Sequence, residues 1–197
     1  TDQTVSLYGV EQLQFDDTTT SLTTTGSGEF HVNTYTTGMQ HNPSTAALSD
    51  GGFVVTWDSN HDGGVYAQIY DAAGAIVGDE FQVNTHTVNN QFDQHITGLN
   101  NGEFVITWTS QNQDGSANGI YAKRYDSAGV IVDDEFLVNT YTAGNEQEPS
   151  ITALNDGGFV ITWTSYNQTP GTGFDIYAQR YDAAGAKATT NAVRSGS

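Results

Sequence analysis

Hydrophobic residues recur along this chain with a period of roughly 50 residues, a length that is typical of one repeated supersecondary unit. An apolar run that begins with glycine and ends in tryptophan appears three times, at residues 51–57, 102–108 and 157–163. Nearly every position of the run is apolar, which is typical of a β-strand that is covered on both faces. The pattern therefore predicts one structural unit that is used three times.

Three further short strands are predicted around each of these runs. One precedes the run and is joined to it by Asp-Gly or Asn-Gly, a strong hairpin signal because both residues tolerate positive φ. Another has the form Tyr-x-x-x-Tyr and leads into an Asp-x-Ala-Gly turn, in which the Asp side chain is expected to bond backbone amides two residues on. The last reads Glu-Phe-x-Val-Asn-Thr and places Phe and Val on one face. The strands that precede the apolar run are 44–49, 94–100 and 150–155. The Tyr-x-x-x-Tyr strands are 65–70, 120–125 and 176–181. The Glu-Phe strands are 80–85 and 135–140, with a further copy at 29–34.

The spacing of these strands shows where the units differ in length. The phenylalanine of the Glu-Phe strand precedes the tryptophan by 27 residues in all three units. The interval from that tryptophan to the first tyrosine of the Tyr-x-x-x-Tyr strand is 9, 13 and 14 residues. All length variation therefore lies in one loop, which we call the variable loop. In repeat proteins such variation is placed on one face, and that face is often the binding face.

The predicted fold is all-β. Four short antiparallel strands in about 50 residues make a β-propeller blade, so the sequence predicts three propeller blades. The third unit has no Glu-Phe strand of its own, and we expect residues 29–34 to complete it. Three blades are too few to close a ring, so we expect a homodimer that closes a six-bladed ring. The alternative is a monomeric threefold β-trefoil or β-prism.

The predicted domain organisation follows from these repeats. Residues 1–28 form an N-terminal extension and linker, residues 29–185 form the three-repeat β domain, and residues 186–197 form a tail. Within the domain the units span about 35–85, 86–140 and 141–185, and the strand at 29–34 is added to them.

The repeat motifs resemble those of a known class of proteins. Phe-Val-Val-Thr-Trp, Tyr-Ala-Gln-Arg-Tyr-Asp and Glu-Phe-x-Val-Asn-Thr, over residues 29–185, resemble tandem repeats of large bacterial secreted and surface proteins of the RTX (haemolysin-type calcium-binding) class. The segment 10–17 is similar to one that often follows the calcium-binding nonapeptide repeats of that class. The resemblance implies propeller-blade-like units and a secreted or cell-surface location in bacteria.

Acidic residues outnumber basic ones by 23 to 5, which gives a formal net charge of −18. Nucleic acid phosphates would be repelled, so nucleic acid is excluded as a partner, whereas hard cations such as calcium would be attracted. The chain has no cysteine, which excludes disulfides and thiol chemistry. No stretch is long and apolar enough to insert into a membrane as a helix.

The variable loop of the first unit carries a candidate calcium motif. Asp58, Asn60 and Asp62 alternate before a glycine, and oxygen ligands at alternate positions are how short calcium loops surround a cation. Ile69 stands where an EF-hand needs an acid, so we expect a compact loop site instead. The second unit keeps Asp114 of this pattern. Calcium is therefore the predicted cofactor, and a polar turn without a metal is the alternative.

Loop residues on the face of the variable loops are the candidate ligand-binding groups. Aromatic rings stack on sugars, and a few convergent polar groups fix a ligand's orientation. The tryptophans are instead expected to pack in the core, since they lie on apolar strands. The alternative for the asparagines is that they cap turns. The predicted ligand-binding residues are Asn33, Asn84, Asn139, Tyr35, His86, Tyr141 and Tyr166.

No catalytic motif is evident in the sequence. The five histidines show no fixed spacing to a nucleophile, and the Gly-x-Ser-x-Gly, His-Glu-x-x-His and phosphate-loop patterns are absent. We therefore predict a secreted or cell-surface binding and adhesion module rather than an enzyme, with a glycan as its partner. Two alternatives stay open: a purely structural spacer of a large adhesin, and a polysaccharide-cleaving enzyme.

Overall fold

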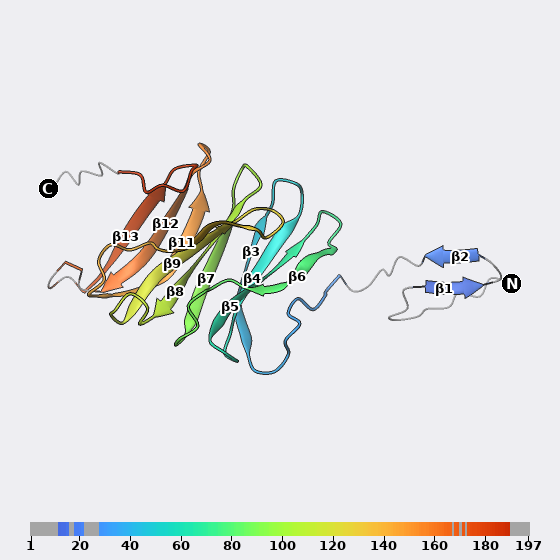
Figure 1. The fold of residues 1–197 in the computed structure, drawn as a ribbon, viewed down its shortest axis with the longest axis horizontal. Coiled ribbons are helices and arrows are strands. Elements are labelled where there is room, and N and C mark those ends of the chain that lie inside the picture. Colours follow the sequence, from blue (N-terminus) through green and yellow to red (C-terminus); the bar gives the residue numbers. More distant parts are fainter. Residues whose placement is uncertain are drawn as a thin grey trace. The chain divides into compact units, whose positions relative to one another are not determined.

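The computed structural model describes residues 12–15, 18–21, 28–166, 168–169, 171 and 173–189. These residues form strands and turns, with no helix among them, and hence none that is long and apolar enough to span a membrane. The chain divides into two units, residues 1–32 and residues 33–197 (Figure 1). The first unit contains a hairpin of β1 (Gln12–Phe15) and β2 (Thr18–Ser21), which lies within residues 1–28, the predicted extension and linker.

The second unit contains three meanders of antiparallel strands, which we call blades 1, 2 and 3. The strands of each blade pair in chain order, from an inner strand to an outer strand, as in a propeller blade. This propeller-like all-β arrangement is the predicted one, in preference to the trefoil or prism. Blade 1 has β3 (Gln40–Ala47), β4 (Phe53–Ser59), β5 (Gly64–Tyr70) and β6 (Ile76–Gln82). Blade 2 has β7 (Gln91–Gly98), β8 (Phe104–Gln111), β9 (Asn118–Tyr125) and β10 (Ile131–Leu137). Blade 3 has β11 (Asn145–Ala153), β12 (Phe159–Tyr166) and β13 (Phe174–Tyr181).

The turns form where the sequence predicts them. Gly51, Gly102 and Gly157 adopt positive φ, between 87° and 92°, at the hairpins before the tryptophan strands. Each Asp-x-Ala-Gly turn is closed by its aspartate: Asp71 accepts hydrogen bonds from the amides of Ala73 (2.9 Å) and Ala75 (2.8 Å), and the same pair of bonds recurs in the other two blades. Local sequence therefore fixes the length and the spacing of the blades.

The hydrophobic core lies between the blades. Because the tryptophan strands are apolar on both faces, each can be covered on one face by the preceding blade and on the other by the next. The three tryptophans are buried, with exposed fractions of 4%, 0% and 6%, as predicted. The core between blades 1 and 2 includes Val54, Val65, Ile69, Phe104, Ile106 and Trp108, and the core between blades 2 and 3 includes Val105, Ile120, Val138, Phe159, Ile161 and Trp163.

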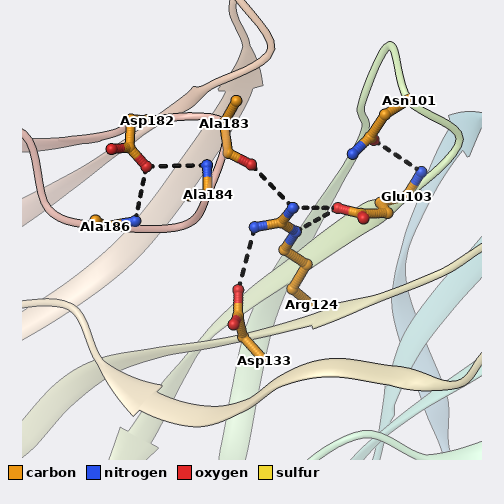
Figure 2. A network of polar contacts seen from close by, with 8 residues as sticks. All are labelled: Asn101, Glu103, Arg124, Asp133, Asp182, Ala183, Ala184 and Ala186. Atoms are coloured by element: carbon orange, nitrogen blue, oxygen red, sulfur yellow. Dashed lines mark hydrogen bonds and ion pairs between the residues drawn. The ribbon is translucent and has the colours of Figure 1, made fainter.

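A buried arginine ties blade 2 to blade 3. Arg124, on β9, is only 5% exposed and contacts the carboxylates of Glu103 and Asp133, both in blade 2. Its guanidinium also donates to the backbone carbonyl of Ala183, in the Asp-x-Ala-Gly turn of blade 3, at 3.0 Å. Figure 2 shows the guanidinium held between the two blade 2 carboxylates and this turn. The contact joins residues that are 59 positions apart, so no local sequence signal indicated it.

Three predicted strand boundaries are corrected by the structure. The inner strands begin three to five residues before the predicted starts, at Gln40, Gln91 and Asn145. The outer strands begin directly after the Asp-x-Ala-Gly turns and end at Gln82 and Leu137, so the Asn-Thr pairs follow them. Residues 29–34, predicted as a strand that completes blade 3, are not in a strand. The sheets are open, so closure of a six-bladed ring stays a proposal.

Candidate functional site

Each inner strand contains a bulge at the same place. The pairing register between the inner strand and its tryptophan strand shifts between His41 and Ser44, between Phe92 and His95, and between Gln147 and Ser150. In each bulge one residue adopts positive φ: Asn42 (52°), Asp93 (52°) and Glu148 (55°). Asparagine and aspartate are the non-glycine residues that most readily take this conformation. Bulges re-aim side chains and are frequent next to functional sites.

The three bulges converge on one pocket of about 430 Å³. Each of β3, β7 and β11 contributes the same three positions to its wall, although these strands are some 50 residues apart in sequence. The result is a polar hollow between the inner strands that carries two carboxylates and an imidazole. Its lining residues are Asn42, Pro43, Ser44, Asp93, Gln94, His95, Glu148, Pro149 and Ser150.

Hydrogen bonds hold the wall of this pocket in place. Gln94 is 2% exposed and its side-chain amide donates to the backbone carbonyl of Asn42, which links the bulges of blades 1 and 2. The buried carboxylate of Asp58 contacts the imidazole of His41 and accepts from the Asn42 amide at 3.1 Å. Glu148, exposed at the other side, accepts from the Thr164 hydroxyl at 3.2 Å. The pocket is therefore built from side chains of all three blades.

The negative charge of Glu148 acts on the carboxyl group of Asp93 in this hollow. The pKa of Asp93 is raised above its ordinary value, chiefly by burial and then by the negative charges of Asp58 and Glu148, while His95 opposes the shift. Burial and a like charge both disfavour the ionised form. Asp93 thus holds a proton to higher pH than an ordinary aspartate does. A protonated carboxyl beside an ionised one is an arrangement used in general acid–base catalysis.

A second pocket, of about 250 Å³, lies at the variable loop of blade 1. The Tyr35 and His61 rings contact each other there, with centroids 4.1 Å apart, and the Tyr35 hydroxyl lies 2.9 Å from His61 Nδ1. The rest of the wall is polar as well and is formed by Gln40, Ser59, Asp62, Tyr66 and Glu80. The structure therefore brings two of the predicted site residues, Tyr35 and Asp62, to one place.

The predicted calcium ligands each bond a different protein partner. Asp58 faces His41 on the inner strand, whereas Asn60 Oδ1 accepts from the Met39 amide at 2.7 Å. Asp62 contacts the Tyr66 hydroxyl and accepts from the Gly64 amide. In blade 2, Asp114 accepts from the amide groups of Ser116 and Asn139. Among the described residues no group of three His, Cys, Asp or Glu side chains surrounds a common point. The donor set does not fit a preformed site, and calcium binding stays a prediction of the sequence.

The Asn-Thr pairs make structural contacts. Asn84 and Asn139 are buried and accept from the backbone amides of Val65 (2.8 Å) and Ile120 (2.7 Å) at the start of β5 and β9. Their side-chain amides donate to the carbonyls of His86 and Tyr141. These bonds match the turn-capping alternative, and neither asparagine lines the two pockets described above.

Of the remaining predicted residues, Asn33, His86 and Tyr141 are half-buried, and Tyr166, the last residue of β12, is exposed. The side-chain amide of Asn33 donates at 2.7 Å to the backbone carbonyl of Tyr35, two residues further along the chain. Asn84 and Asn139 make the same bond. Tyr166 is 43% exposed and its ring packs against Phe174, with centroids 5.0 Å apart.

Sequence reasoning missed the acids of the first pocket. Asp93 and Glu148 precede the predicted starts of their inner strands, at residues 94 and 150, so the pattern does not place them in a strand. A signal was available: when the three repeats are aligned on their tryptophans, both acids fall at the position of Asn42. Only their convergence on one pocket required the fold.

Glu146, at the start of β11, is a buried acid outside both pockets. Its side chain is fully buried, and burial raises its pKa from 4.5 to about 7, with the charge of Asp114 adding to the shift and the Ser165 hydroxyl opposing it. The other two blades carry glutamine at this place, Gln40 and Gln91. The native site therefore accepts a neutral side chain of the same shape.

Replacing Glu146 with glutamine is expected to change the pH dependence of stability. The native carboxyl holds its proton up to about pH 7 and the unfolded one only to about pH 4.5, so stability from this group is present below pH 4.5 and is lost as the pH rises to 7. We expect wild type to lose on the order of 2 kcal/mol relative to Glu146→Gln between these pH values. Urea unfolding at pH 4.5 and pH 8 measures this; parallel curves for the two proteins would contradict it.

Comparisons with known proteins give no sequence family. No family model matches the chain, and no curated protein matches it. Several solved structures are similar in fold. An endo-arabinase from Bacteroides thetaiotaomicron has 14% identity and a TM-score of 0.47 over 75% of this chain and 61% of its own. The polysaccharide lyase Uly1 has 14% identity and a TM-score of 0.49 over 79% and 41%. An α-L-arabinofuranosidase from Lactobacillus brevis has 10% identity and a TM-score of 0.48 over 80% and 57%.

These matches correct one prediction. The sequence predicted that the chain is not an enzyme, and that prediction is contradicted, since the matched structures are of an arabinase, a polysaccharide lyase and an arabinofuranosidase. The chain spans less than two thirds of each of these proteins. At these identities the likeness is one of fold, and it leaves the choice of activity to the geometry of the site.

Proposed function

We propose that the pocket formed by the three bulges binds a polysaccharide and cleaves it, with Asp93 and Glu148 as the reacting acids. One observation carries the proposal: three equivalent positions of the repeat meet at one pocket, and two of them hold carboxylates in different environments. Glycoside cleavage uses a pair of carboxyl groups, one protonated and one ionised. A glycan as partner was also the prediction from the sequence.

Each acid has a role that follows from its surroundings. Asp93 is half-buried and has a raised pKa, so it donates its proton to the glycosidic oxygen as that oxygen leaves. Glu148 is exposed to solvent, so it can reach the attacking water and takes a proton from it. Asp58 sustains the raised pKa of Asp93 by its negative charge. Activity is therefore expected to fall as the pH rises through the pKa of Asp93.

A second candidate function is glycan binding without cleavage at the Tyr35–His61 pocket. The specific support is a contacting pair of rings beside the carboxylates of Asp62 and Glu80. Rings bind the apolar face of a sugar, and carboxylates accept bonds from its hydroxyls. Tyr35→Ala is expected to weaken such binding without altering cleavage.

The test compares variants on a panel of soluble polysaccharides that includes arabinan. Asn42 shows that asparagine fits the bulge, so Asp93→Asn and Glu148→Asn keep the fold while removing each acid. We expect each to release reducing sugar at least about 100-fold more slowly than wild type. Asp79→Asn, an exposed acid on β6, is the matched control and should leave the rate unchanged.

Three outcomes decide between the functions. Loss of cleavage in both pocket variants and none in the control supports the proposal. Binding of a polysaccharide that Tyr35→Ala abolishes, with no sugar release by wild type, supports the binding function and contradicts cleavage. Neither binding nor release on any member of the panel contradicts both and favours the structural spacer.

A further inference from the structure

Among the residues that the structure describes, the outer edge of blade 3 carries only half of an outer strand. In blades 1 and 2 the outer strand first pairs through Ile76 with Tyr70 and through Ile131 with Tyr125. Blade 3 has the equivalent bridge between Lys187 and Tyr181, followed by a bond from the Ala188 amide to the Arg180 carbonyl at 2.9 Å. The first half of a fourth strand therefore begins in blade 3 as it does in the others.

The second half of the outer strand makes three contacts in blades 1 and 2. Its phenylalanine pairs with an alanine, Phe81 with Ala67 and Phe136 with Ala122. Its valine amide donates at 2.8 Å to the carbonyl of Val65 in blade 1 and of Ile120 in blade 2. The next residue is an asparagine, and its side-chain oxygen accepts a hydrogen bond from the backbone amide of Val65 in blade 1 or of Ile120 in blade 2. The corresponding residues of blade 3 are Ala178 and Ile176, and no described residue makes these contacts with them.

The side chains of this edge are apolar and open to solvent. Ile176 is 70% exposed, whereas its equivalents Val65 and Ile120 are 0% exposed. Ala178 is exposed as well, although Ala67 and Ala122 are fully buried. The edge of blade 3 is therefore a surface that the repeat normally covers with two layers, the rest of the outer strand and the next blade.

The chain also carries the matching sequence motif, at residues 29–34, far from blade 3 in sequence. It reads Glu-Phe-His-Val-Asn-Thr, which follows the outer-strand motif. Asn33 already has the conformation of Asn84 and Asn139, since each donates to the carbonyl two residues on, at 2.7, 2.8 and 2.9 Å. Its side-chain oxygen has no hydrogen-bond partner among the described residues. The side-chain oxygens of Asn84 and Asn139, in contrast, accept hydrogen bonds from the backbone amides of Val65 and Ile120.

Thr34 shows where this strand would leave a blade. Its amide donates to the Glu80 carboxylate of blade 1 at 2.6 Å, just as the Thr85 amide donates to Glu135 of blade 2 at 2.5 Å. Thr34 thus contacts blade 1 as Thr85 contacts blade 2. Its place is that of a residue that follows the outer strand of an adjoining blade.

We propose that residues 29–34 of one copy complete blade 3 of a second copy. The repeat fixes the register: Phe30 pairs with Ala178, the Val32 amide donates to the Ile176 carbonyl, and Asn33 Oδ1 accepts from the Ile176 amide. Blade 1 of the first copy then covers the Ile176 face. Because each copy offers both the strand and the edge, two copies exchange strands reciprocally about a twofold axis. Six blades result, within the range of 4 to 8 that closes a propeller.

The mass of the full chain in solution tests the exchange. Light scattering at tens of micromolar is expected to give about 42 kDa, twice the 21.1 kDa of one chain. Ile176→Asp places a charge in the proposed interface and should give about 21 kDa with unchanged circular dichroism, since Ile176 is exposed in the single chain. Val130→Asp, at a position that is 62% exposed in a turn of blade 2, is the matched control and should stay dimeric.

A cross-link then tests the register. The chain has no cysteine, so a Phe30→Cys copy mixed with an Ala178→Cys copy should form a disulfide-linked pair on oxidation, while Phe30→Cys mixed with Val130→Cys should not. A wild-type monomer, a dimer that survives Ile176→Asp, a mass well above 42 kDa, or equal cross-linking in both mixtures would each overturn the proposal.

Discussion

Replacing Trp108 with alanine is expected to lower the free energy of unfolding by about 3–5 kcal/mol. Trp108 is fully buried in the core between blades 1 and 2, on a strand that both neighbouring blades cover. Truncation removes a large apolar side chain and leaves a cavity that the surrounding β-sheet cannot collapse to fill. Since small domains have only about 5–15 kcal/mol of net stability, this loss is a large share of the total.

Two further variants separate packing from hydrogen bonding at this position. The indole nitrogen of Trp108 has no hydrogen-bond partner, so Trp108→Phe loses only volume and should cost clearly less than the alanine variant. Val88→Ala, at a residue that is 61% exposed, should change stability by less than about 0.5 kcal/mol. Urea unfolding measures all three. Equal losses for Trp108→Phe and Trp108→Ala would contradict the packing account.

Removing the side chain of Arg124 is expected to cost about 2–3 kcal/mol. The guanidinium is almost fully buried and bonds Glu103, Asp133 and the Ala183 carbonyl (Figure 2). Breaking a buried ion pair by deleting one partner typically costs about 3–5 kcal/mol, because the other charge is left without compensation. Here the two carboxylates are partly exposed, at 20% and 38%, so water recovers part of that loss.

Arg180 is the matched control for Arg124. It stands at the same place in blade 3 and contacts Asp156, but both side chains are about half exposed, so Arg180→Ala should cost less than about 1 kcal/mol. Both variants are compared in the Ile176→Asp background, where contacts with a second copy do not enter. Similar losses for the two arginines would show that Arg124 does not tie blade 2 to blade 3 in solution.

Local signals were strong enough to predict the blades. The apolar tryptophan strands, the Asp-Gly hairpins and the Asp-x-Ala-Gly turns depend on residues within about five positions of one another, and each is found where predicted. The strand starts were less predictable, because the inner strands begin with polar residues and contain a bulge. Alternation of apolar and polar residues is interrupted at a bulge, so the pattern there resembles a turn.

The candidate sites divide in the same way. Tyr35 and Asp62 were predicted because aromatic and acidic residues in loops are informative by type, and they line one pocket. Asn84 and Asn139 were chosen by type as well, yet their side chains are consumed by backbone amides of the neighbouring strand. Residue type shows which chemistry a side chain can perform, whereas its partners decide whether the side chain is available for it.

By itself, therefore, the sequence determined the repeat, the strand content, the burial of the tryptophans and the place of the variable loop, because these depend on neighbours along the chain. Only the tertiary structure decided that Asn42, Asp93 and Glu148 meet at one pocket and that Asp58 faces the inner strand rather than the loop. It also revealed that Ile176 is uncovered where Val65 and Ile120 are buried. The physical reason is the same in each case: these environments are formed by strands that are about 50 residues apart in the chain and adjacent only after the blades pack.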